Sequence, residues 1–300
     1  MYLDVWNQEN TRGYGRIAFK YFVIMPYSPA NDYYSNQGNE RSKALSDVWN
    51  GLRLAPLWLA LAYEDIRTRY MRSFAGIGWV FMSFAFFVYV KIIIFAPLSG
   101  KDLVSFAPYV TIGYFVWMFI SHSVTEACST FISSKGWIKG SLVPYSTFVF
   151  RTVTRNLFVT LINALVVVII LAYTRTTPNM VAFFAVPMFA LMIINAISVS
   201  FIFGALAARY RDFMHMISTL MRVMLFLTPI FWLPEQMGEL WTRVLIYNPF
   251  AHFLISIRDP ILYGTIPYLS VYVVLGCTVL TIVGAVVVFT YSRRRIPFWI

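Results

Sequence analysis

The sequence predicts an all-α integral membrane protein with six transmembrane helices. Two observations lead to this prediction: the chain is far more apolar than a soluble domain, and its apolar residues gather into six long stretches. Of the 300 residues 59% are hydrophobic and only 12% are charged, whereas soluble domains carry about 25% charged residues. A soluble fold of this size has too little interior for so much apolar surface, so the bilayer must act as part of the solvent.

Each apolar stretch is near or above the roughly 20 residues that a helix needs to cross a hydrocarbon core of about 30 Å. We place the spans at about residues 77–96, 106–126, 150–173, 180–207, 213–233 and 268–291. Because the number of spans is even, both termini are expected on the same side of the membrane.

Basic residues orient the spans, because Lys and Arg are enriched in cytoplasmic loops. One set of loops carries ten of them and the opposite set carries four, so both termini are expected in the cytoplasm. The ten are Arg67, Arg69, Arg72, Lys135, Lys139, Arg209, Arg211, Arg293, Arg294 and Arg295, and the four are Lys101, Arg175, Arg243 and Arg258. The same bias explains the net charge of +11 better than nucleic-acid binding does.

Two segments precede the first span. Residues 1–45 are polar and aromatic with several prolines, which is typical of an irregular extension, either ordered against a partner or flexible. The apolar stretch Ile17–Met25 is interrupted by Lys20 and has no cleavage pattern, so it is not a signal peptide. Residues 46–66 have the pattern of an amphipathic helix at the membrane surface, broken near Pro56.

A charged collar, YEDIRTRYMRSFAGIGW (Tyr63–Trp79), joins this surface helix to the first span. In a helix, Glu64–Arg67 and Asp65–Arg69 are i,i+3 and i,i+4 pairs in the favourable acid-first order. The chain therefore divides into an extension (1–45), an interface helix with its collar (46–76), a six-span domain (77–291) and a basic tail (292–300).

The last outer loop, residues 234–267, holds two short apolar stretches at about 240–247 and 250–263. Asn248-Pro249 separates them, and each is too short to span a bilayer. Two short re-entrant helices that dip into the membrane fit this pattern, and so do helices that lie flat at the interface.

Known catalytic and metal-binding motifs are missing from the sequence. The Gly100-Lys101 pair has Phe95 where an ATP-binding P-loop needs glycine and Asp102 where it needs Ser or Thr. Three histidines fall in three different segments, and two cysteines, Cys128 and Cys277, are expected on opposite sides of the membrane. We therefore expect no catalytic residue, no metal site and no cofactor bound by this chain.

Charged and aromatic residues inside the spans are the candidate substrate contacts. Lys91, Arg151 and Arg155 lie near span ends and are expected to snorkel, whereas Arg222 lies near the middle of the fifth span. Arg222 should face the bundle interior or a watery cavity, unless the span begins later.

Aromatic residues share faces of the first, second and fifth spans, where they suit the apolar faces of sugar rings. Ordinary helix packing and an interfacial aromatic belt are the alternative for most of them. The residues are Phe84 and Phe87 with Lys91, Tyr114 and Trp117 with Ser121, and Phe226, Phe231 and Trp232.

Two cytoplasmic loops have the size and charge of docking elements for a soluble partner. They are STFISSKGWIKGSLVP (Ser129–Pro144) and RYRD (Arg209–Asp212). Short basic loops also serve simply as topology anchors.

Four stretches together resemble one family. EDIRTRYMRSFAGIGW precedes the first span, RYRDF follows the fourth, LTPIFWLPE ends the fifth, and YNPFAHFLISIRDPIL lies in the last outer loop. In content, order and spacing they are similar to the permease subunit of type-2 ABC exporters, in the branch that exports O-antigen, capsule or teichoic acid. The first 45 residues lie outside the resemblance, and Gly76-Ile-Gly78-Trp79 departs from the usual Leu-Gly before the tryptophan.

The resemblance implies a homodimer in the bacterial cytoplasmic (inner) membrane, bound to two copies of a separate ATPase subunit that carries ATP and Mg. The substrate would be a lipid-linked polysaccharide, and no nucleic acid is implied. Lys91, Arg222 and the cytoplasmic basic residues would be placed to meet the pyrophosphate of the lipid carrier.

The resemblance, together with the charged collar and the two expected cytoplasmic loops, implies roles for three sets of residues. The substrate channel set is Phe84, Phe87, Lys91, Tyr114, Trp117, Arg222, Phe226, Phe231 and Trp232. The ATPase-coupling set is Glu64, Asp65, Arg67, Arg69, Lys135, Trp137, Lys139, Arg209, Arg211 and Asp212. The outer gate set is Glu235, Glu239, Trp241, Asn248, Pro249 and Arg258.

Two alternatives remain at this point. One is a type-2 ABC exporter of another lipid or of a drug. The other is a membrane-embedded transferase acting on lipid-linked sugars, which needs a carboxylate or histidine as acid or base. The acidic residues near the membrane, such as Glu126, Glu235 and Asp259, lie at span ends or in loops, which disfavours the transferase.

Overall fold

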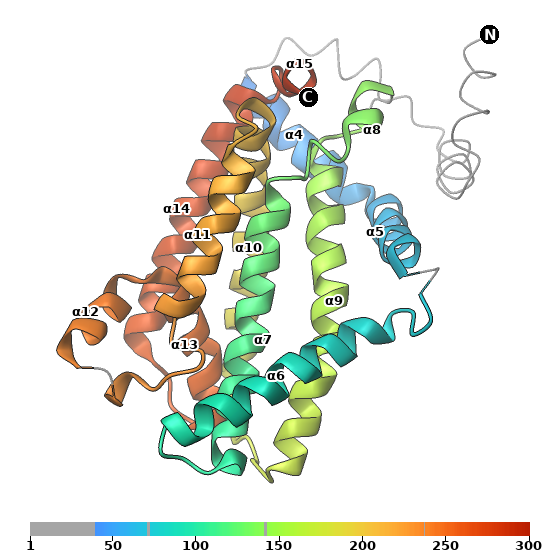
Figure 1. The fold of residues 1–300 in the computed structure, drawn as a ribbon. Coiled ribbons are helices and arrows are strands. Elements are labelled where there is room, and N and C mark those ends of the chain that lie inside the picture. Colours follow the sequence, from blue (N-terminus) through green and yellow to red (C-terminus); the bar gives the residue numbers. More distant parts are fainter. Residues whose placement is uncertain (1–39, 71–72, 141–142, 237) are drawn as a thin grey trace.

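The computed structural model describes residues 40–300 except 71–72, 141–142 and 237. Within these residues every regular element is a helix, as predicted (Figure 1). Five helical segments are long and apolar enough to cross a membrane, so the chain is a multi-pass membrane protein. They are α6 (Gly78–Leu98), α7 (Leu103–Ala127), α9 (Ser146–Tyr173), η1 (Met180–Phe184) continuing into α10 (Ala185–Arg209), and α14 (Tyr268–Ser292).

The sixth expected span, residues 213–233, is helical only in its first part. Helix α11 (Phe213–Leu227) has 15 residues, about 22 Å at 1.5 Å per residue. It ends before Thr228-Pro229 because proline lacks an N–H group and disfavours a helical conformation in the residue before it. The expected helical end at residue 233 was therefore wrong. Residues 228–233 continue without helix, and we call them the strap.

Helix α7 is the centre of the bundle. In its apolar window 72% of the residues are buried, compared with 17–22% in the other four spans. It packs against α6, α9, α10 and α11, and against α13 (Pro249–Leu262) from the expected last outer loop. Elements far apart in the sequence are therefore positioned against this one helix.

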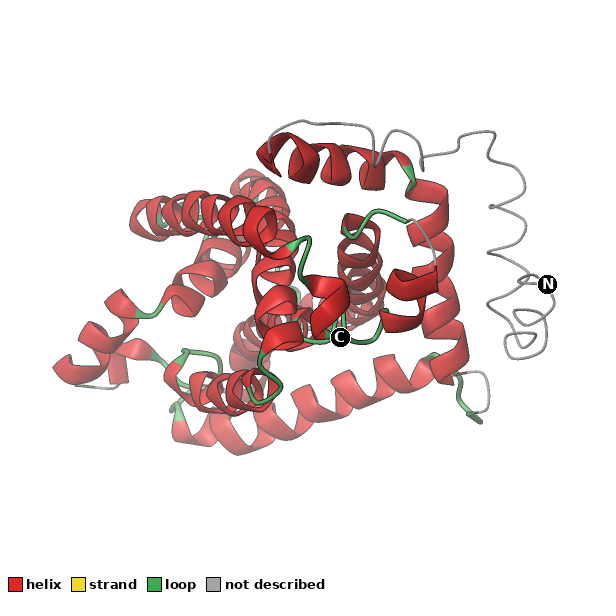
Figure 2. Ribbon diagram, turned by 90° about the horizontal axis from the view of Figure 1, so that it is seen from above, coloured by secondary structure: helices red, strands yellow, loops and turns green. Residues whose placement is uncertain are grey.

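The surface helix predicted for residues 46–66 is two helices, α4 (Glu40–Arg53) and α5 (Ala55–Tyr70). The break lies at Leu54, and Pro56 follows in the first turn of α5, where its missing N–H group leaves no helical hydrogen bond unmade. The helix begins at Glu40 rather than near Ser46, so only residues 1–39 of the expected extension remain, and they lie outside the described residues. Figure 2 shows α4, α5 and α6 along three successive sides of the bundle.

The segment between α11 and α14, which was expected to be the last outer loop, contains the two short helices that the sequence predicts. A turn of 3-10 helix, η2 (Pro234–Gln236), leads to α12 (Glu239–Tyr247), and Asn248 separates α12 from α13. Helix α13 packs against α7, α10 and α14, and its Ala251 and Leu254 are fully buried. The core of the bundle therefore includes part of this loop.

Two short helices lie at the end of the bundle that is at the top of Figure 1, which we call the upper end. They are α8 (Lys135–Gly140) and α15 (Ile296–Trp299). The expected basic tail, residues 292–300, is folded: Ile296 is fully buried in an apolar cluster with Phe131, Phe148 and Phe289. An apolar Ile-Pro-Phe-Trp sequence after the basic run explains why it packs.

Substituting Gly51 with alanine tests the close packing of α4 on the start of α9. A Cβ at Gly51 would lie 2.0 Å from Oγ of Ser146, and this hydroxyl donates to the Asp47 carbonyl oxygen 2.7 Å away, so it is not free to move. We expect Gly51→Ala to lower the free energy of unfolding by about 1–3 kcal/mol. Gly276→Ala on α14 is the control, since a Cβ there meets nothing within 4 Å. Thermal unfolding in detergent compares them, and equal midpoints would contradict the close packing.

Candidate functional site

Aromatic side chains from three elements meet at Lys91 of α6. Its ammonium nitrogen lies 3.3 Å from the ring centre of Tyr114 on α7 and 4.7 Å from that of Phe231 in the strap. Phe87, one turn earlier on α6, is 5.4 Å from the same nitrogen. A cation over aromatic faces is stabilised by about 0.5–2 kcal/mol. The rings therefore hold the Lys91 charge, which was expected to snorkel outward.

Most other aromatic residues of the predicted channel set pack helices together. Phe84 stacks on Tyr114 with ring centres 5.5 Å apart, and Trp117 lies edge-on to a phenylalanine of α13. Phe84, Tyr114, Trp117 and Phe231 are all buried. Within one chain these four residues therefore pack helices together, which was the alternative to a role in binding sugar rings. Trp232 packs apart from them, 5.4 Å from the ring of Trp241.

Arg222 and Phe226 are exposed on α11 and lie outside the Lys91 cluster. Helix α11 buries Ile217 and Met221, and it packs on α7 and α10. Arg222 was expected to face either the bundle interior or a watery cavity. In this chain it does not face the bundle interior.

A network of ion pairs joins α5 to α7 and α9 near the upper end. Asp65 accepts hydrogen bonds from Nε of Arg151 at 2.7 Å and from Nη1 of Arg155 at 3.0 Å. The second guanidinium nitrogen of Arg155 lies 2.7 Å from the carboxylate of Glu126 on α7. Arg151 and Arg155, predicted to snorkel, are instead almost enclosed by these carboxylates. We call Asp65, Arg69, Glu126, Arg151 and Arg155 the collar network.

The collar itself pairs differently from the sequence-based expectation. Glu64 and Arg67 lie 3.6 Å apart, as the i,i+3 spacing predicts. Among the described ion pairs, however, Arg69 lies 3.8 Å from Glu126 and not on Asp65. Asp65 is buried against α9, where two guanidinium groups form stronger, shorter contacts than an exposed i,i+4 pair.

A second buried carboxylate, Asp47 of α4, joins this helix to two others. It accepts hydrogen bonds from the backbone N–H groups of Tyr145 and Ser146 at 3.3 and 3.0 Å, at the start of α9. It also lies 3.2 Å from Nε of Arg293 at the end of α14. A helix N-terminus attracts negative charge because its first N–H groups have no helical partner. Asp47 therefore fixes α4 against both α9 and α14.

The remaining coupling residues gather at the upper end. Lys135 and Lys139 of α8 are exposed, while Trp137 between them is half-buried. Helix α15 contacts both α8 and α10, and the guanidinium of Arg209 lies 5.4 Å from the ring centre of Trp299. Arg211 and Asp212 are exposed in the turn between α10 and α11. The structure thus brings the two predicted docking loops to one end of the molecule.

The strap is held through its backbone. Tyr109 on α7 places its hydroxyl 3.2 Å from the carbonyl oxygen of Pro229 and 3.0 Å from that of Trp232. Arg258 on α13 donates to the same Pro229 oxygen at 2.7 Å, and its guanidinium lies 3.9 Å from the Tyr109 ring centre. Asn248 donates to the Leu227 carbonyl oxygen at 3.2 Å, which satisfies an acceptor left by the end of α11.

Other residues of the predicted outer gate lie close to the strap. Pro249 begins α13, and the Asn248 side chain caps that helix by accepting from the N–H group of Phe250 at 3.0 Å. Asp259 lies 3.6 Å from Arg258; burial raises the pKa of this carboxyl group, while Arg258 opposes the shift. Glu235 is exposed, and the side chain of Glu239 lies outside the described residues.

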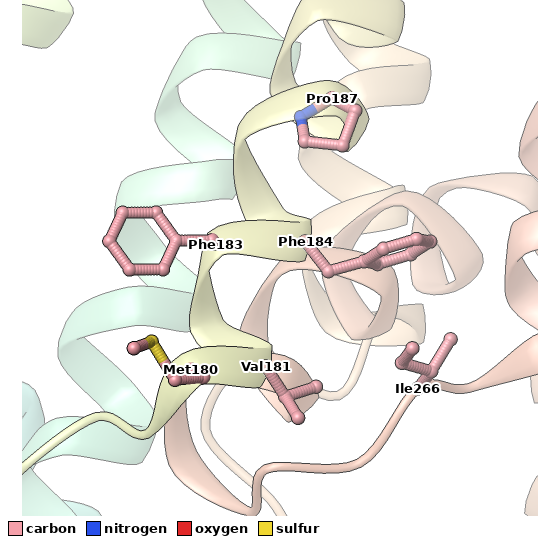
Figure 3. A pocket seen from close by; sticks show the side chains of 6 residues that line it. All are labelled: Met180, Val181, Phe183, Phe184, Pro187 and Ile266. Carbon is pink, nitrogen blue, oxygen red and sulfur yellow. The ribbon is translucent and has the colours of Figure 1, made fainter.

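A shallow apolar depression lies at the lower end of the bundle. Met180, Val181, Phe183, Phe184 and Pro187 line it from one side and Ile266 from the other (Figure 3). None of these side chains carries a hydrogen-bond donor, and the thioether of Met180 is only a weak acceptor. The depression therefore does not suit the hydroxyl groups of a saccharide.

Asp47, Glu126, Arg151 and Arg155 are the important residues that were not assigned to a site from the sequence. One signal was present for three of them. Glu126 ends the second expected span and the two arginines begin the third, so these span boundaries already place opposite charges at a similar depth on neighbouring helices. Asp47 had no such signal, since its partners lie about a hundred and more residues later.

One protein family and three related proteins match most of this chain. The family described as ABC-2 type transporter matches residues 56–262. An O-antigen export system permease protein RfbA of Klebsiella pneumoniae is 26% identical over 234 residues, covering 77% of this chain and 90% of that protein. A second RfbA from the same organism is 24% identical with the same coverage. RfbA of Myxococcus xanthus is 22% identical over 203 residues, covering 67% and 78%.

Removing the Asp65 carboxylate tests the collar network. We expect Asp65→Ala to lower the free energy of unfolding by about 3–5 kcal/mol, because two buried guanidinium groups lose a partner. Asp102→Ala is the matched control, because this carboxylate is exposed and makes no side-chain capping hydrogen bond before α7, so its loss should cost less than about 1 kcal/mol. Denaturant titration in detergent measures the free energy of unfolding of both variants. A loss for Asp65→Ala no greater than for the control would contradict the stabilising role of Asp65 in the collar network.

The hydroxyl of Tyr109 can be tested in the same way. Tyr109→Phe keeps the ring under Arg258 but leaves the strap carbonyl groups without this donor, so we expect a loss of about 1–2 kcal/mol. Tyr263→Phe at the end of α13 is the control, because this side chain is largely exposed. Hydrogen exchange at residues 228–233 should rise in Tyr109→Phe alone; unchanged exchange would mean that the hydroxyl does not hold the strap.

Proposed function

Because this chain belongs to the ABC-2 type transporter family, we propose that it is the permease subunit of an ATP-driven exporter of a lipid-linked, O-antigen-like polysaccharide. The observation that carries the proposal is the similarity to O-antigen export permeases over 90% of their length. Permease subunits of this family are not themselves catalytic. Neither export of a drug or another lipid nor a sugar transferase is favoured by these relatives.

The working unit in this proposal is a homodimer with two copies of a separate ATPase, which binds ATP and Mg. The upper end suits such a partner, since Lys135, Lys139 and Arg211 are exposed there beside the surface helices. Exposed cations next to a half-buried Trp137 favour an acidic surface with an apolar centre. Helix α8 and the 209–212 turn are the contacts through which ATPase movement reaches the bundle.

In this arrangement the upper end faces the cytoplasm and the protein lies in the bacterial inner membrane. Helix α11 and the strap together form the sixth crossing, and α12 and α13 are re-entrant helices at the outer mouth. The strap supports this view: its carbonyl groups bond to Tyr109 and Arg258, as non-helical backbone at membrane depth requires.

The collar network offers a route from the ATPase to the spans. Helix α5 lies at the surface, yet Asp65 bonds directly to two residues of α9, and Arg155 continues the contact to Glu126 on α7. A tilt of α5 would therefore pull on α7 and α9 as well as on α6, which follows it in the chain. Coupling through ion pairs in this way needs no deformation of the packed core.

Deletion of the gene tests the proposed function in the cell. We expect the lipid-linked glycan to accumulate on the inner side of the cytoplasmic membrane, because its synthesis continues without an exit. Surface glycan should disappear, as measured by immunoblotting of intact cells, and the full chain expressed in trans should restore it. An ATPase subunit with its P-loop lysine replaced should give the same phenotype. Normal surface glycan in the deletion strain would overturn the proposal.

A further inference from the structure

Charged side chains inside the apolar helices identify one residue without a partner. In α6, α7, α9, α10, α11 and α14 these side chains are Lys91, Glu126, Arg151, Arg155, Arg209 and Arg222. Aromatic rings hold Lys91 and Arg209, and ion pairs hold Glu126, Arg151 and Arg155. Among the interactions of the described residues, Arg222 has neither a carboxylate nor a ring.

Arg222 is part of a polar line on the exposed side of α11. His215, Thr219, Arg222 and Phe226 are spaced by four, three and four residues, so they share one helix face. All four are exposed, and we call this face the α11 stripe. Arg222 lies ten residues beyond Asp212, the residue before the helix, or roughly 15 Å along it. This is about half the thickness of a hydrocarbon core.

An unpaired guanidinium at this depth costs several kcal/mol in lipid, so it calls for an anion. A second copy of this chain cannot supply one from its spans, because Glu126 is the one acidic residue in the helices named above and Arg155 already binds it. Outside these helices, Asp259 on α13 lies 3.6 Å from Arg258 of its own chain, and Glu235 and Glu239 lie beyond the strap at the proposed outer mouth. The anion is therefore expected from another molecule that reaches the middle of the membrane.

The surroundings of Arg222 select an amphiphilic anion. Its neighbours Val223 and Phe226 on α11 are exposed and apolar, while Thr219 and His215 lie along the stripe toward the upper end. A lipid phosphate group combines an acceptor for the guanidinium with a chain for the apolar neighbours, and arginine binds phosphate oxygens in a bidentate fork.

We propose that the α11 stripe binds the phosphate headgroup of the lipid that carries the exported saccharide, with Arg222 as its principal contact. The inference rests on the proposed function and narrows it to one face of one helix. Lys91, the other cation expected to meet this group, is engaged by Tyr114 and Phe231 and is not part of the site. His215 and Thr219 are further contacts along the stripe, between Arg222 and the upper end.

Binding of defined lipids to the full-length chain tests the proposal. The probe is undecaprenyl diphosphate, with uncharged undecaprenol and phosphatidylglycerol as comparison lipids, and native mass spectrometry measures the dissociation constants. We expect Arg222→Gln to weaken binding of the diphosphate by at least about tenfold, since a charged hydrogen-bonding group is lost. Arg222→Lys should keep most of the affinity, and Lys101→Gln, an exposed cation in the α6–α7 loop, should change nothing.

Undecaprenol should bind all variants equally, which verifies that each has folded. Equal diphosphate affinity of Arg222→Gln and the unchanged chain would overturn the inference. So would an equal loss for phosphatidylglycerol, which would make the occupant a bulk anionic lipid. Full disulfide cross-linking between Arg222→Cys chains, with or without the diphosphate, would overturn it by assigning the stripe to an interface between copies.

The outcome is separable from that of the proposed function. If gene deletion leaves the glycan inside the cell but Arg222→Gln binds the diphosphate as tightly as the unchanged chain, only the inference about the α11 stripe fails. If the deletion strain displays its glycan normally, the proposed function fails whatever the titration shows.

Discussion

The Asp65 carboxylate is the interaction on which the position of the surface helices depends. Burying a carboxylate or a guanidinium group without a partner costs several kcal/mol, so Asp65, Arg151 and Arg155 must remain together. Asp47 imposes the same requirement on α4, where it joins the first N–H groups of α9 to Arg293. These two carboxylates fix both surface helices to the bundle, and an external force on α4 or α5 acts on the spans directly.

At the opposite end a different constraint applies, since the strap has backbone groups that no helix satisfies. Tyr109 of α7 and Arg258 of α13 supply donors to strap carbonyl groups, and Asn248 donates to the carbonyl oxygen of Leu227 at the end of α11. Helix α7 is common to both ends: Glu126 near its last turn belongs to the collar network, and Tyr109 near its first turns holds the strap. Its deep burial makes it the most direct mechanical link between the proposed ATPase surface and the proposed outer gate.

The cations inside the spans fall into two groups. Rings or carboxylates of the same chain hold most of the charges inside the spans, which makes them structural. Arg222 differs because α11 packs through its opposite face and leaves the arginine exposed. An export permease has to let a charged headgroup cross an apolar barrier. A cation on an otherwise apolar helix lowers the barrier to that crossing, provided that it is not neutralised by its own chain.

Long apolar runs determined the helical class, five of the spans and the two short helices of the last loop, because hydrophobic length is a local property that needs no partner. The Glu64–Arg67 pair was predictable for the same reason, being set by helix spacing alone. Tertiary structure decided which partner each buried charge takes. Asp65 binds two guanidinium groups of α9, about ninety residues later in the chain, and Arg69 pairs with Glu126 instead. Tertiary structure also decided the positions of the strap and the tail. Pro229 ends α11 locally, but the hydrogen bonds from Tyr109 and Arg258 determine the path of the strap. Contacts between residues distant in sequence depend on how whole helices pack, and no short stretch of sequence contains that information.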